Sequence, residues 1–350
     1  MDKLKVDAMP LWERLAHANK PIVLYGMGNG ADKIICELEA CGIPFEGVFA
    51  SDGFVRGQVF WEHTVTTYAQ AKEKFGDMVV LVAFGTHRQD VMQNILRISG
   101  EQEVYVPDVE VAGSVAFTES FFEAHKSEFE QAYELLADKE SRELYTSMLN
   151  YKIGGEISRL MEYTSDDGLF SQEFLNLSED EIYVDAGAYD GDTVQAFAKR
   201  VGNYKKIYAL EPDAKNFKKL LKNTKEFDNC VCFNSAADDA NGNALFAANA
   251  GRQSALNGDV GQAVQTCKID GIAPDATLIK LDVEGNERRA IIGACEVISK
   301  NKPKMLVSAY HRNEDLYALP LQVFEQRQDY RVYLRRFPAV PAWDLIYYFV

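Results

Sequence analysis

The chain has no long apolar segment and no excess of positive charge, and both absences narrow what it can do. Nowhere in its 350 residues do 18 apolar residues run together, so we expect no transmembrane helix. Residues 1–21 are charged and lack the apolar core of a secretory signal, so we expect no signal peptide. The net charge of −16 would repel phosphate groups, which disfavours nucleic acid as a partner.

The six cysteines do not form a metal-binding or disulfide pattern. The sequence contains no CxxC pair, and no histidines stand near the cysteines at zinc-finger spacing. Cys230 and Cys232 lie two apart in a strand-like run and would share one face of that strand. We therefore expect a reduced, cytoplasmic protein without a structural metal site.

Composition and length indicate two globular units. Hydrophobic residues make up 47% of the chain and charged residues 26%, which is the ordinary range for globular proteins. A chain of 350 residues is more than twice the length of a typical domain. We expect an α/β protein with two Rossmann-like domains: residues 1–115, a helical connector at 116–166, and residues 167–350.

The amino-terminal unit begins with a strand, a glycine loop, a helix and a second strand. The loop contains Gly26, Gly28 and Gly30. Ala31 follows, at the position where a dinucleotide-binding fingerprint has its last glycine or alanine. Asp52 ends the second strand. Further apolar runs cover 59–65, 78–87 and 103–108. We name Gly26, Gly28, Gly30 and Asp52 as candidate ligand residues for a nucleotide or nucleotide-sugar; a purely structural loop is the alternative.

The connector shows helical periodicity. Apolar residues fall on one stripe between Thr118, placed as an N-cap, and Leu136, and a second run follows Asp138. Because these stripes need burial, we expect packed helices here rather than a flexible linker.

The carboxyl-terminal unit contains seven strand-like runs that alternate with helices, which predicts a doubly wound sheet. No helix-length pattern separates the last two, so they should pair as an antiparallel hairpin. The loop at 247–261, where we expect substrate contacts, carries no readable pattern. The seven runs cover 181–187, 205–212, 229–237, 277–285, 303–310, 329–337 and 344–350.

The turn after the first of these strands is a candidate ligand loop. Gly187 and Gly191 would let backbone approach a ligand closely, and a helix begins near Asp192. Asp185 and Asp190 would make this turn anionic. A negative turn argues against a pyrophosphate and for a cationic ligand such as S-adenosylmethionine.

An acidic residue ends the second strand of this unit. Glu211 is placed to accept hydrogen bonds from two ribose hydroxyls, as the acid of a dinucleotide site does. Pro212 would start the next helix, where its missing N–H is not needed. A solvated strand end is the alternative. The candidate cofactor-binding residues are Asp185, Gly187, Tyr189, Asp190, Gly191, Thr193, Glu211, Pro212 and Asp282.

The strand near residue 280 alternates apolar and charged residues. A period of two places Lys280, Asp282 and Glu284 on one side, where they form either a self-satisfied ion cluster or the working face of a site. We expect a catalytic carboxylate among Asp282 and Glu284, and a substrate-orienting role for Lys280. A Mg²⁺ ion on the two carboxylates is an alternative, although the sequence offers no evident third ligand.

His311 follows the fifth strand and is the candidate general base. A buried structural histidine is the competing interpretation.

Taken together, these motifs resemble the FkbM family of S-adenosylmethionine-dependent methyltransferases. The resemblance covers residues 168–350 and depends on four blocks in order: DAGAYDGDTVQAF, YALEPD, IKLDVEGNERRAIIGA and SAYHRNEDLYALP. It implies a class I methyltransferase fold, which ends in an antiparallel hairpin, the cofactor S-adenosylmethionine, and methylation of a hydroxyl on a sugar, glycan or other small molecule. Asn286 stands where the family commonly has alanine.

Two other functions stay open at this stage. The protein could be a non-catalytic nucleotide- or nucleotide-sugar-binding regulator that retains a methyltransferase fold. Alternatively, the amino-terminal unit could bind NAD as an oxidoreductase, with His87 as its one evident acid or base.

Overall fold

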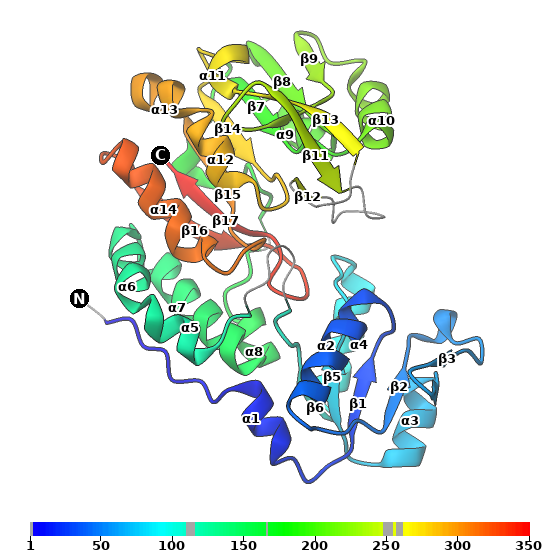
Figure 1. The fold of residues 1–350 in the computed structure, drawn as a ribbon. Helices are drawn as coiled ribbons and strands as arrows, with labels where there is room; N and C mark the ends of the chain where they lie inside the picture. The colour runs from blue at the N-terminus through cyan, green and yellow to red at the C-terminus, as the bar shows by residue number, and fades with distance from the viewer. Residues whose placement is uncertain (1–2, 110–115, 166, 248–254, 257–261) are drawn as a thin grey trace.

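The computed structural model describes residues 3–109, 116–165, 167–247, 255–256 and 262–350 (Figure 1). Most of the 247–261 loop therefore lies outside the described residues. No helix in the described part of the chain combines the length and the hydropathy needed to cross a bilayer.

The amino-terminal residues form a four-stranded parallel sheet in the order β2-β1-β5-β6. The predicted run at 59–65 does not join it. That run folds instead into a separate antiparallel hairpin, because Trp61 and Glu62 adopt left-handed backbone conformations that reverse the chain. The elements are α1 (Leu11–Ala16), β1 (Ile22–Tyr25), α2 (Asn29–Ala40), β2 (Gly47–Phe49), η1 (Asp52–Phe54), β3 (Val59–Phe60), β4 (His63–Thr64), α3 (Tyr68–Phe75), β5 (Val79–Val82), α4 (Gln89–Ser99) and β6 (Glu103–Tyr105).

The segment after this sheet is helical, as its periodicity predicts. Thr118 and Asp138 are both N-caps whose side chains accept a backbone N–H three residues on. Phe122, Phe129 and Leu136 are buried along the predicted stripe. The helices are α5 (Glu119–Ala124), α6 (Lys126–Leu135), α7 (Lys139–Gly154) and α8 (Ile157–Met161).

The carboxyl-terminal residues form a seven-stranded sheet, and each of the seven predicted runs contributes one strand to it. Their order is β16-β17-β15-β14-β7-β8-β9, with β17 antiparallel to both neighbours, so the predicted terminal hairpin is present. The strands are β7 (Ile182–Ala186), β8 (Lys206–Leu210), β9 (Cys230–Phe233), β14 (Leu278–Leu281), β15 (Lys304–Ser308), β16 (Val332–Arg336) and β17 (Leu345–Phe349). The helical elements of this unit are η2 (Glu173–Leu175), which precedes β7, and α9 (Asp192–Val201), α10 (Ala214–Thr224), α11 (Ile269–Ile272), α12 (Glu287–Ile292), α13 (Cys295–Asn301) and α14 (Asp315–Gln326), which lie between the strands.

Alternation along the strands divides the side chains between two apolar layers. Val184 and Ile279 face the core that includes α7, α12, α13 and α14, whereas Tyr183 and Leu278 face the core that includes α9 and α10. Asp185 and Lys280 fall on the same face as Tyr183 and Leu278. Two charged side chains therefore enter an otherwise apolar layer beside α9.

A small second sheet was not predicted. The run at 229–237 is not one strand, because it breaks at Asn234, whose side-chain amide donates to the carbonyl oxygens of Glu211 and Pro212. The second half then pairs away from the large sheet, in the order β10-β13-β11-β12. These strands are β10 (Ser235–Ala237), β11 (Gly242–Ala247), β12 (Ala255–Leu256) and β13 (Gln262–Cys267).

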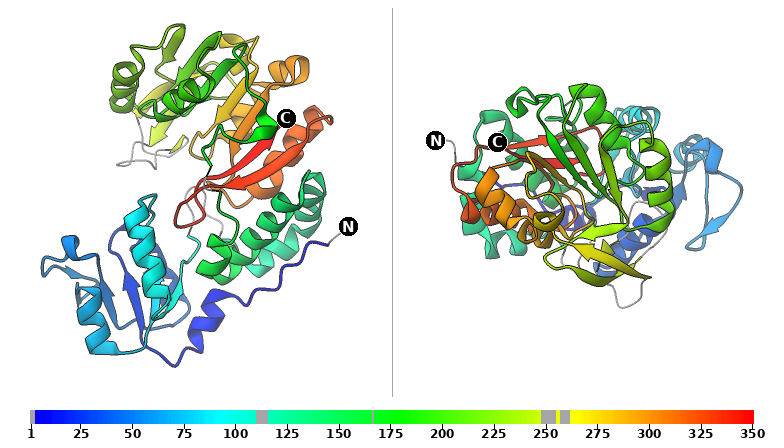
Figure 2. Two further views of the ribbon diagram at one scale, coloured as in Figure 1. Left: turned by 180° about the vertical axis from the view of Figure 1, so that it is seen from behind. Right: turned by 90° about the horizontal axis from the view of Figure 1, so that it is seen from above.

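The two large sheets occupy separate lobes, and the helical segment packs against the second of them (Figures 1 and 2). Helix α6 contacts α14, and α7 contacts β16. One continuous set of buried side chains nevertheless includes Val23 and Val80 of the first sheet, Phe129 of α6 and Tyr347 of β17. The lobes are therefore joined through apolar packing as well as by the chain.

Candidate active site

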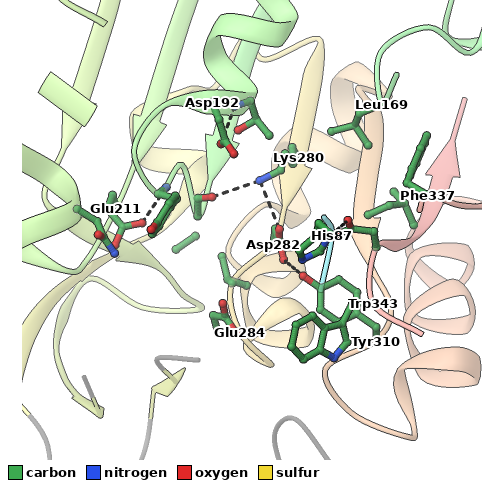
Figure 3. A pocket seen from close by; sticks show the side chains of 18 of the residues that line it. His87, Leu169, Asp192, Glu211, Lys280, Asp282, Glu284, Tyr310, Phe337 and Trp343 are labelled. Atoms are coloured by element: carbon green, nitrogen blue, oxygen red, sulfur yellow. Dashed lines mark hydrogen bonds and ion pairs between the residues drawn. The ribbon is translucent and has the colours of Figure 1, made fainter. Parts of the chain in front are cut away.

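A cavity of about 550 Å³ lies at the carboxyl ends of β7, β8, β14 and β15. Its volume is in the range of small-molecule sites, and this edge of an open α/β sheet is where ligands bind. Figure 3 shows Glu211 at one end, Lys280 and Asp282 in the middle, and Trp343 at the other end. The sequence-based candidates that line it are Gly187, Tyr189, Thr193, Glu211, Pro212, Lys280, Asp282 and Glu284.

Four other candidates of the carboxyl-terminal unit do not line this cavity. Asp185 and His311 are buried beneath it, at 0% and 1% exposure. Gly191 is the N-cap of α9 and faces Leu220 of α10. Asp190 is placed outside the lining, where its carbonyl oxygen accepts a hydrogen bond from Asn223. The ligand loop and the start of α9 thus meet the cavity through Gly187, Tyr189, Asp192 and Thr193.

Gly187 is required by close packing of two loops. Its φ is +84°, and a Cβ built on it would lie 1.8 Å from the carbonyl oxygen of Asp282. Only glycine tolerates both the left-handed conformation and this approach. The absence of a side chain therefore lets the loop after β7 contact the loop after β14.

Glu211 is a buried carboxylate that faces the cavity at the end of β8. Its two oxygens accept backbone N–H groups, Oε2 from Tyr189 at 2.9 Å and Oε1 from Asp213 at 2.8 Å. Burial raises the pKa of Glu211 to about 7, although those two hydrogen bonds oppose the rise. Two backbone contacts hold the carboxylate in place and leave it acceptor capacity toward a ligand.

Pro212 does not begin the next helix. It precedes the N-cap Asp213, whose carboxylate accepts the N–H groups of Lys215 and Asn216. Asp213 is therefore the residue that caps α10. Pro212, one residue earlier, lines the cavity.

Lys280 connects the buried layer to the cavity. Its Nζ lies 3.1 Å from Asp185 Oδ1, 3.2 Å from the carbonyl oxygen of Gly187 and 3.8 Å from Asp282 Oδ2. Burial opposes the charged form, yet the carboxylates of Asp185 and Asp282 raise the pKa of Lys280. Thr193 also donates to Asp185. This lysine is therefore a cation held by fixed partners.

The strand β14 ends at Leu281, so Asp282 and Glu284 belong to the turn that follows it. Glu284 and Gly285 have φ values of +54° and +90°, which makes the turn sharp. Glu287 Oε1 accepts the N–H groups of Val283 at 2.9 Å and Gly285 at 3.4 Å. The strand alternation predicted for this segment therefore stops at Leu281. A turn held by hydrogen bonds to Glu287 follows, and it still presents Asp282 and Glu284 to the cavity.

The acids of this turn differ in charge state. Burial opposes ionisation of Asp282, but Lys280 and His311 outweigh it and lower the pKa of that carboxyl group. Burial raises the pKa of Glu284 to about 8, and the neighbouring acids Asp282 and Glu287 add to the rise. At neutral pH, Asp282 is ionised and Glu284 is mostly protonated.

His311 is enclosed by carboxylates. Its Nδ1 lies 2.9 Å from Glu287 Oε1, and its Nε2 lies 3.6 Å from Asp282 Oδ1 and 3.5 Å from Glu284 Oε2. Burial disfavours the charged ring, but these acids outweigh it and raise the pKa of His311 to about 10. Asp282, Glu287 and His311 also bring ligand-type atoms within 4.8 Å of one another. For the Mg²⁺ alternative, the structure therefore offers Glu287 and His311 as possible further ligands beside Asp282, which the sequence did not reveal.

The far end of the cavity is built from residues that the sequence analysis did not place there. Tyr310, which follows β15, donates to Asp282 Oδ1 at 3.1 Å. Phe337, Trp343 and Asp344 come from the connection between β16 and β17, and His87 comes from the amino-terminal unit. The sequence had offered His87 only as an acid or base of a separate amino-terminal site, and the others had no signal beyond their position next to a strand, which singles out no particular residue.

Two of the three glycines of the amino-terminal loop, Gly26 and Gly30, allow close packing in this structure. A Cβ on Gly26 would lie 2.6 Å from the Phe84 ring, and one on Gly30 would lie 2.6 Å from the carbonyl oxygen of Ala83. Gly28 has a φ of +140°, and Asp52 begins the short helix η1. Ligand binding by Gly26, Gly28, Gly30 and Asp52 stays a prediction.

The cavity has a strong excess of acids. Seven aspartates and glutamates line it, against Lys280 and His87. Because such a lining repels anions, it suits a ligand that carries positive charge.

Comparison with known proteins gives a family match within the second lobe. Residues 185–336 match the model of the methyltransferase FkbM domain. A methyltransferase FkbM from Methylobacillus flagellatus has a similar fold, with a TM-score of 0.71 and 21% identity, over 97% of this chain and 92% of that one. No curated protein matches the chain significantly.

Other solved structures are more distant. An rRNA methylase from Streptococcus thermophilus shares 14% identity, with a TM-score of 0.35 over 52% of this chain and 98% of that one. A fibrillarin from Aeropyrum pernix, solved with natively bound S-adenosylmethionine, shares 11% identity, with a TM-score of 0.31 over 49% of this chain and 67% of that one. Neither similarity is close enough to support a functional argument.

Proposed function

We propose that this chain, which carries a methyltransferase FkbM domain over residues 185–336, transfers a methyl group from S-adenosylmethionine to a hydroxyl of a sugar, glycan or related small molecule. The observation that carries the proposal is Glu211, a buried carboxylate held by two backbone N–H groups at the end of β8 and facing an acid-lined cavity.

The chemistry of the lining fits this cofactor. Glu211 presents a carboxylate to which both hydroxyls of a ribose can donate. The alanines Ala236 and Ala237 line the same cavity and offer an apolar surface to a base. The surrounding acids favour a cation. When bound, S-adenosylmethionine supplies an electrophilic methyl group on a positively charged sulfur.

Lys280 has a positioning role in this proposal. Its contacts to Asp185, to the carbonyl of Gly187 and to Asp282 link the ligand loop to the β14 turn. Holding those two loops in one geometry keeps the reacting groups aligned, which is the main source of acceleration in such a transfer.

The acids and the histidine near Asp282 act electrostatically rather than as the base. Asp282 is a weak proton acceptor because its pKa is lowered. His311 carries its proton at neutral pH because its pKa is raised to about 10, and Glu284 is mostly protonated with a pKa of about 8. We therefore assign the general-base role to none of these three.

Calorimetry tests the cofactor. We expect wild-type protein to bind S-adenosylmethionine and Glu211→Gln to bind it about 10- to 100-fold more weakly, because two charge-assisted hydrogen bonds are weakened. The exposed Glu226→Gln in the loop after α10 is the matched control and should bind normally. Absence of binding by the wild type would exclude the proposal.

The non-catalytic alternative makes a different prediction. A regulator would bind the cofactor, and Glu211→Gln would lower its affinity for the cofactor to the same extent. It would transfer no methyl group from labelled cofactor to any glycan or small-molecule fraction.

A further inference from the structure

The two lobes each contribute one residue to a close histidine–carboxylate contact at the cavity end opposite Glu211. His87 follows β5 of the amino-terminal sheet, and Asp344 precedes β17 of the large sheet. His87 Nδ1 lies 3.0 Å from Asp344 Oδ2. Both side chains line the cavity and are about one-third exposed, at 31% and 36%. The pair can therefore meet a ligand.

The loop that carries His87 is firmly held against the second lobe. The backbones of Thr86 and Val340 form two hydrogen bonds. The nitrogen of Thr86 lies 2.7 Å from the oxygen of Val340, and the nitrogen of Val340 lies 2.9 Å from the oxygen of Thr86. Gly85 lies against the Trp343 ring so closely that a Cβ would approach it to 2.0 Å. Because these contacts fix the backbone next to His87, the fold determines where the His87 side chain enters the cavity.

The position of His87 matches the acceptor side of the proposed reaction. Figure 3 shows His87 beside Trp343 and Tyr310, with Lys280 and Asp282 between this group and Glu211. If Glu211 holds the cofactor ribose, an acceptor must enter from the opposite end. That end offers aromatic rings, on which a sugar ring can lie, beside a polar imidazole.

The contact with Asp344 also sets the chemistry of the ring. A carboxylate at Nδ1 favours the tautomer that carries its proton on Nδ1, which leaves a lone pair on Nε2. His311 differs, because acids surround both of its ring nitrogens and keep it charged.

We propose that His87 is the catalytic base for methyl transfer and that Asp344 is its positioning residue, so that the amino-terminal lobe completes the active site. The inference rests on the proposed function, which supplies the methyl donor. His87 Nε2 takes the proton of the acceptor hydroxyl as its O–H bond breaks. The oxygen forms a bond to the methyl carbon, and the carbon–sulfur bond breaks with its electron pair left on sulfur. His87 then returns the proton to water.

The test uses the full chain and four variants: His87→Gln, His87→Ala, Asp344→Asn and, as a control, His17→Gln on the exposed end of α1. Transfer of ¹⁴C is followed from methyl-labelled S-adenosylmethionine to a deproteinised extract of the producing organism. We expect His87→Gln to lose 10²- to 10⁴-fold in rate, with cofactor affinity unchanged within twofold. Added imidazole should partly restore His87→Ala, and His17→Gln should match the wild type.

A second readout does not depend on turnover. In ¹⁵N-histidine-labelled protein, long-range NMR spectra should show His87 with its proton on Nδ1, and Asp344→Asn should move that proton to Nε2. A wild-type His87 protonated on Nε2, or an undiminished rate in His87→Gln, would overturn this inference alone. Failure of the wild type to bind the cofactor or transfer label would overturn the proposed function, and this inference with it.

Discussion

Lys280 and Asp185 are direct register partners on the adjacent parallel strands β14 and β7, and their side chains form an ion pair of 3.1 Å in a layer that is otherwise apolar. Asp185 is fully buried, and Lys280 is 4% exposed. Removing one partner of such a pair leaves an uncompensated charge, whereas removing both leaves none. The pair is therefore a structural element of the site, which the contact of Lys280 with Asp282 extends to the cavity.

We expect Lys280→Met to destabilise the fold by about 3–5 kcal/mol, because Asp185 loses its buried cation. The double variant Asp185→Asn with Lys280→Met should lose less stability than Lys280→Met alone, because no unpaired charge stays buried. Urea denaturation of the wild type, both single variants and the double variant measures the coupling. Additive losses would show that the two side chains do not depend on each other.

Gly187→Ala should unfold at a much lower temperature than the wild type and bind little cofactor, because its Cβ would collide with the Asp282 carbonyl at 1.8 Å. Gly202→Ala is the matched control, since Gly202 has nearly the same φ, +81°, with nothing within 4 Å. Its ψ of −79° lies outside the left-handed helical region, so an alanine there is strained, but Gly202→Ala should lose less stability than Gly187→Ala because no atom meets its Cβ. Equal losses in the two variants would mean that backbone conformation alone explains Gly187.

Cofactor affinity should depend on pH through Glu211. The pKa of Glu211 is raised to about 7 by burial, and a protonated acid accepts fewer ribose hydrogen bonds. Below pH 7, affinity should therefore fall, approaching tenfold per pH unit, and above pH 8 it should level off. Calorimetry from pH 5.5 to 8.5 measures this dependence, which Glu211→Gln should lack. A flat wild-type profile would mean that binding does not require the ionised acid.

His311 should make the fold less stable in alkali. Its pKa is raised to about 10 in the folded protein, above its ordinary value of about 6.5. The folded state therefore holds the proton more tightly, so this stabilisation is fully present below pH 6.5 and is lost as pH rises through 10. Thermal unfolding from pH 6 to 10 should show the loss in the wild type.

His311→Asn supplies the comparison for that pH series. It should be less stable than the wild type by roughly 3 kcal/mol at pH 7, because the acids around the ring lose their cation. Its stability should also change less between pH 7 and 10. As a control, the exposed His17→Asn should behave as the wild type does.

Local patterns were enough to predict the large sheet. Each of its strands is a short apolar run next to a turn or helix signal, and the absence of a helix before β17 was enough to predict the hairpin. Glu211 could be named because a strand end is visible in the sequence, and strand ends meet at one edge of a parallel sheet. The break at Asn234 was not visible, because it depends on hydrogen bonds to Glu211 and Pro212 from a distant strand.

The sequence alone thus determined the seven strands, the helical segment and the acids at the sheet edge, since these follow from periodicity and from turns between neighbouring residues. Only the tertiary structure decided which groups meet. It buried His311 among acids, placed Asp185 below the cavity and brought His87 against Asp344. Charge states and partners of this kind depend on burial and on contacts between residues far apart in the chain, which no local pattern records.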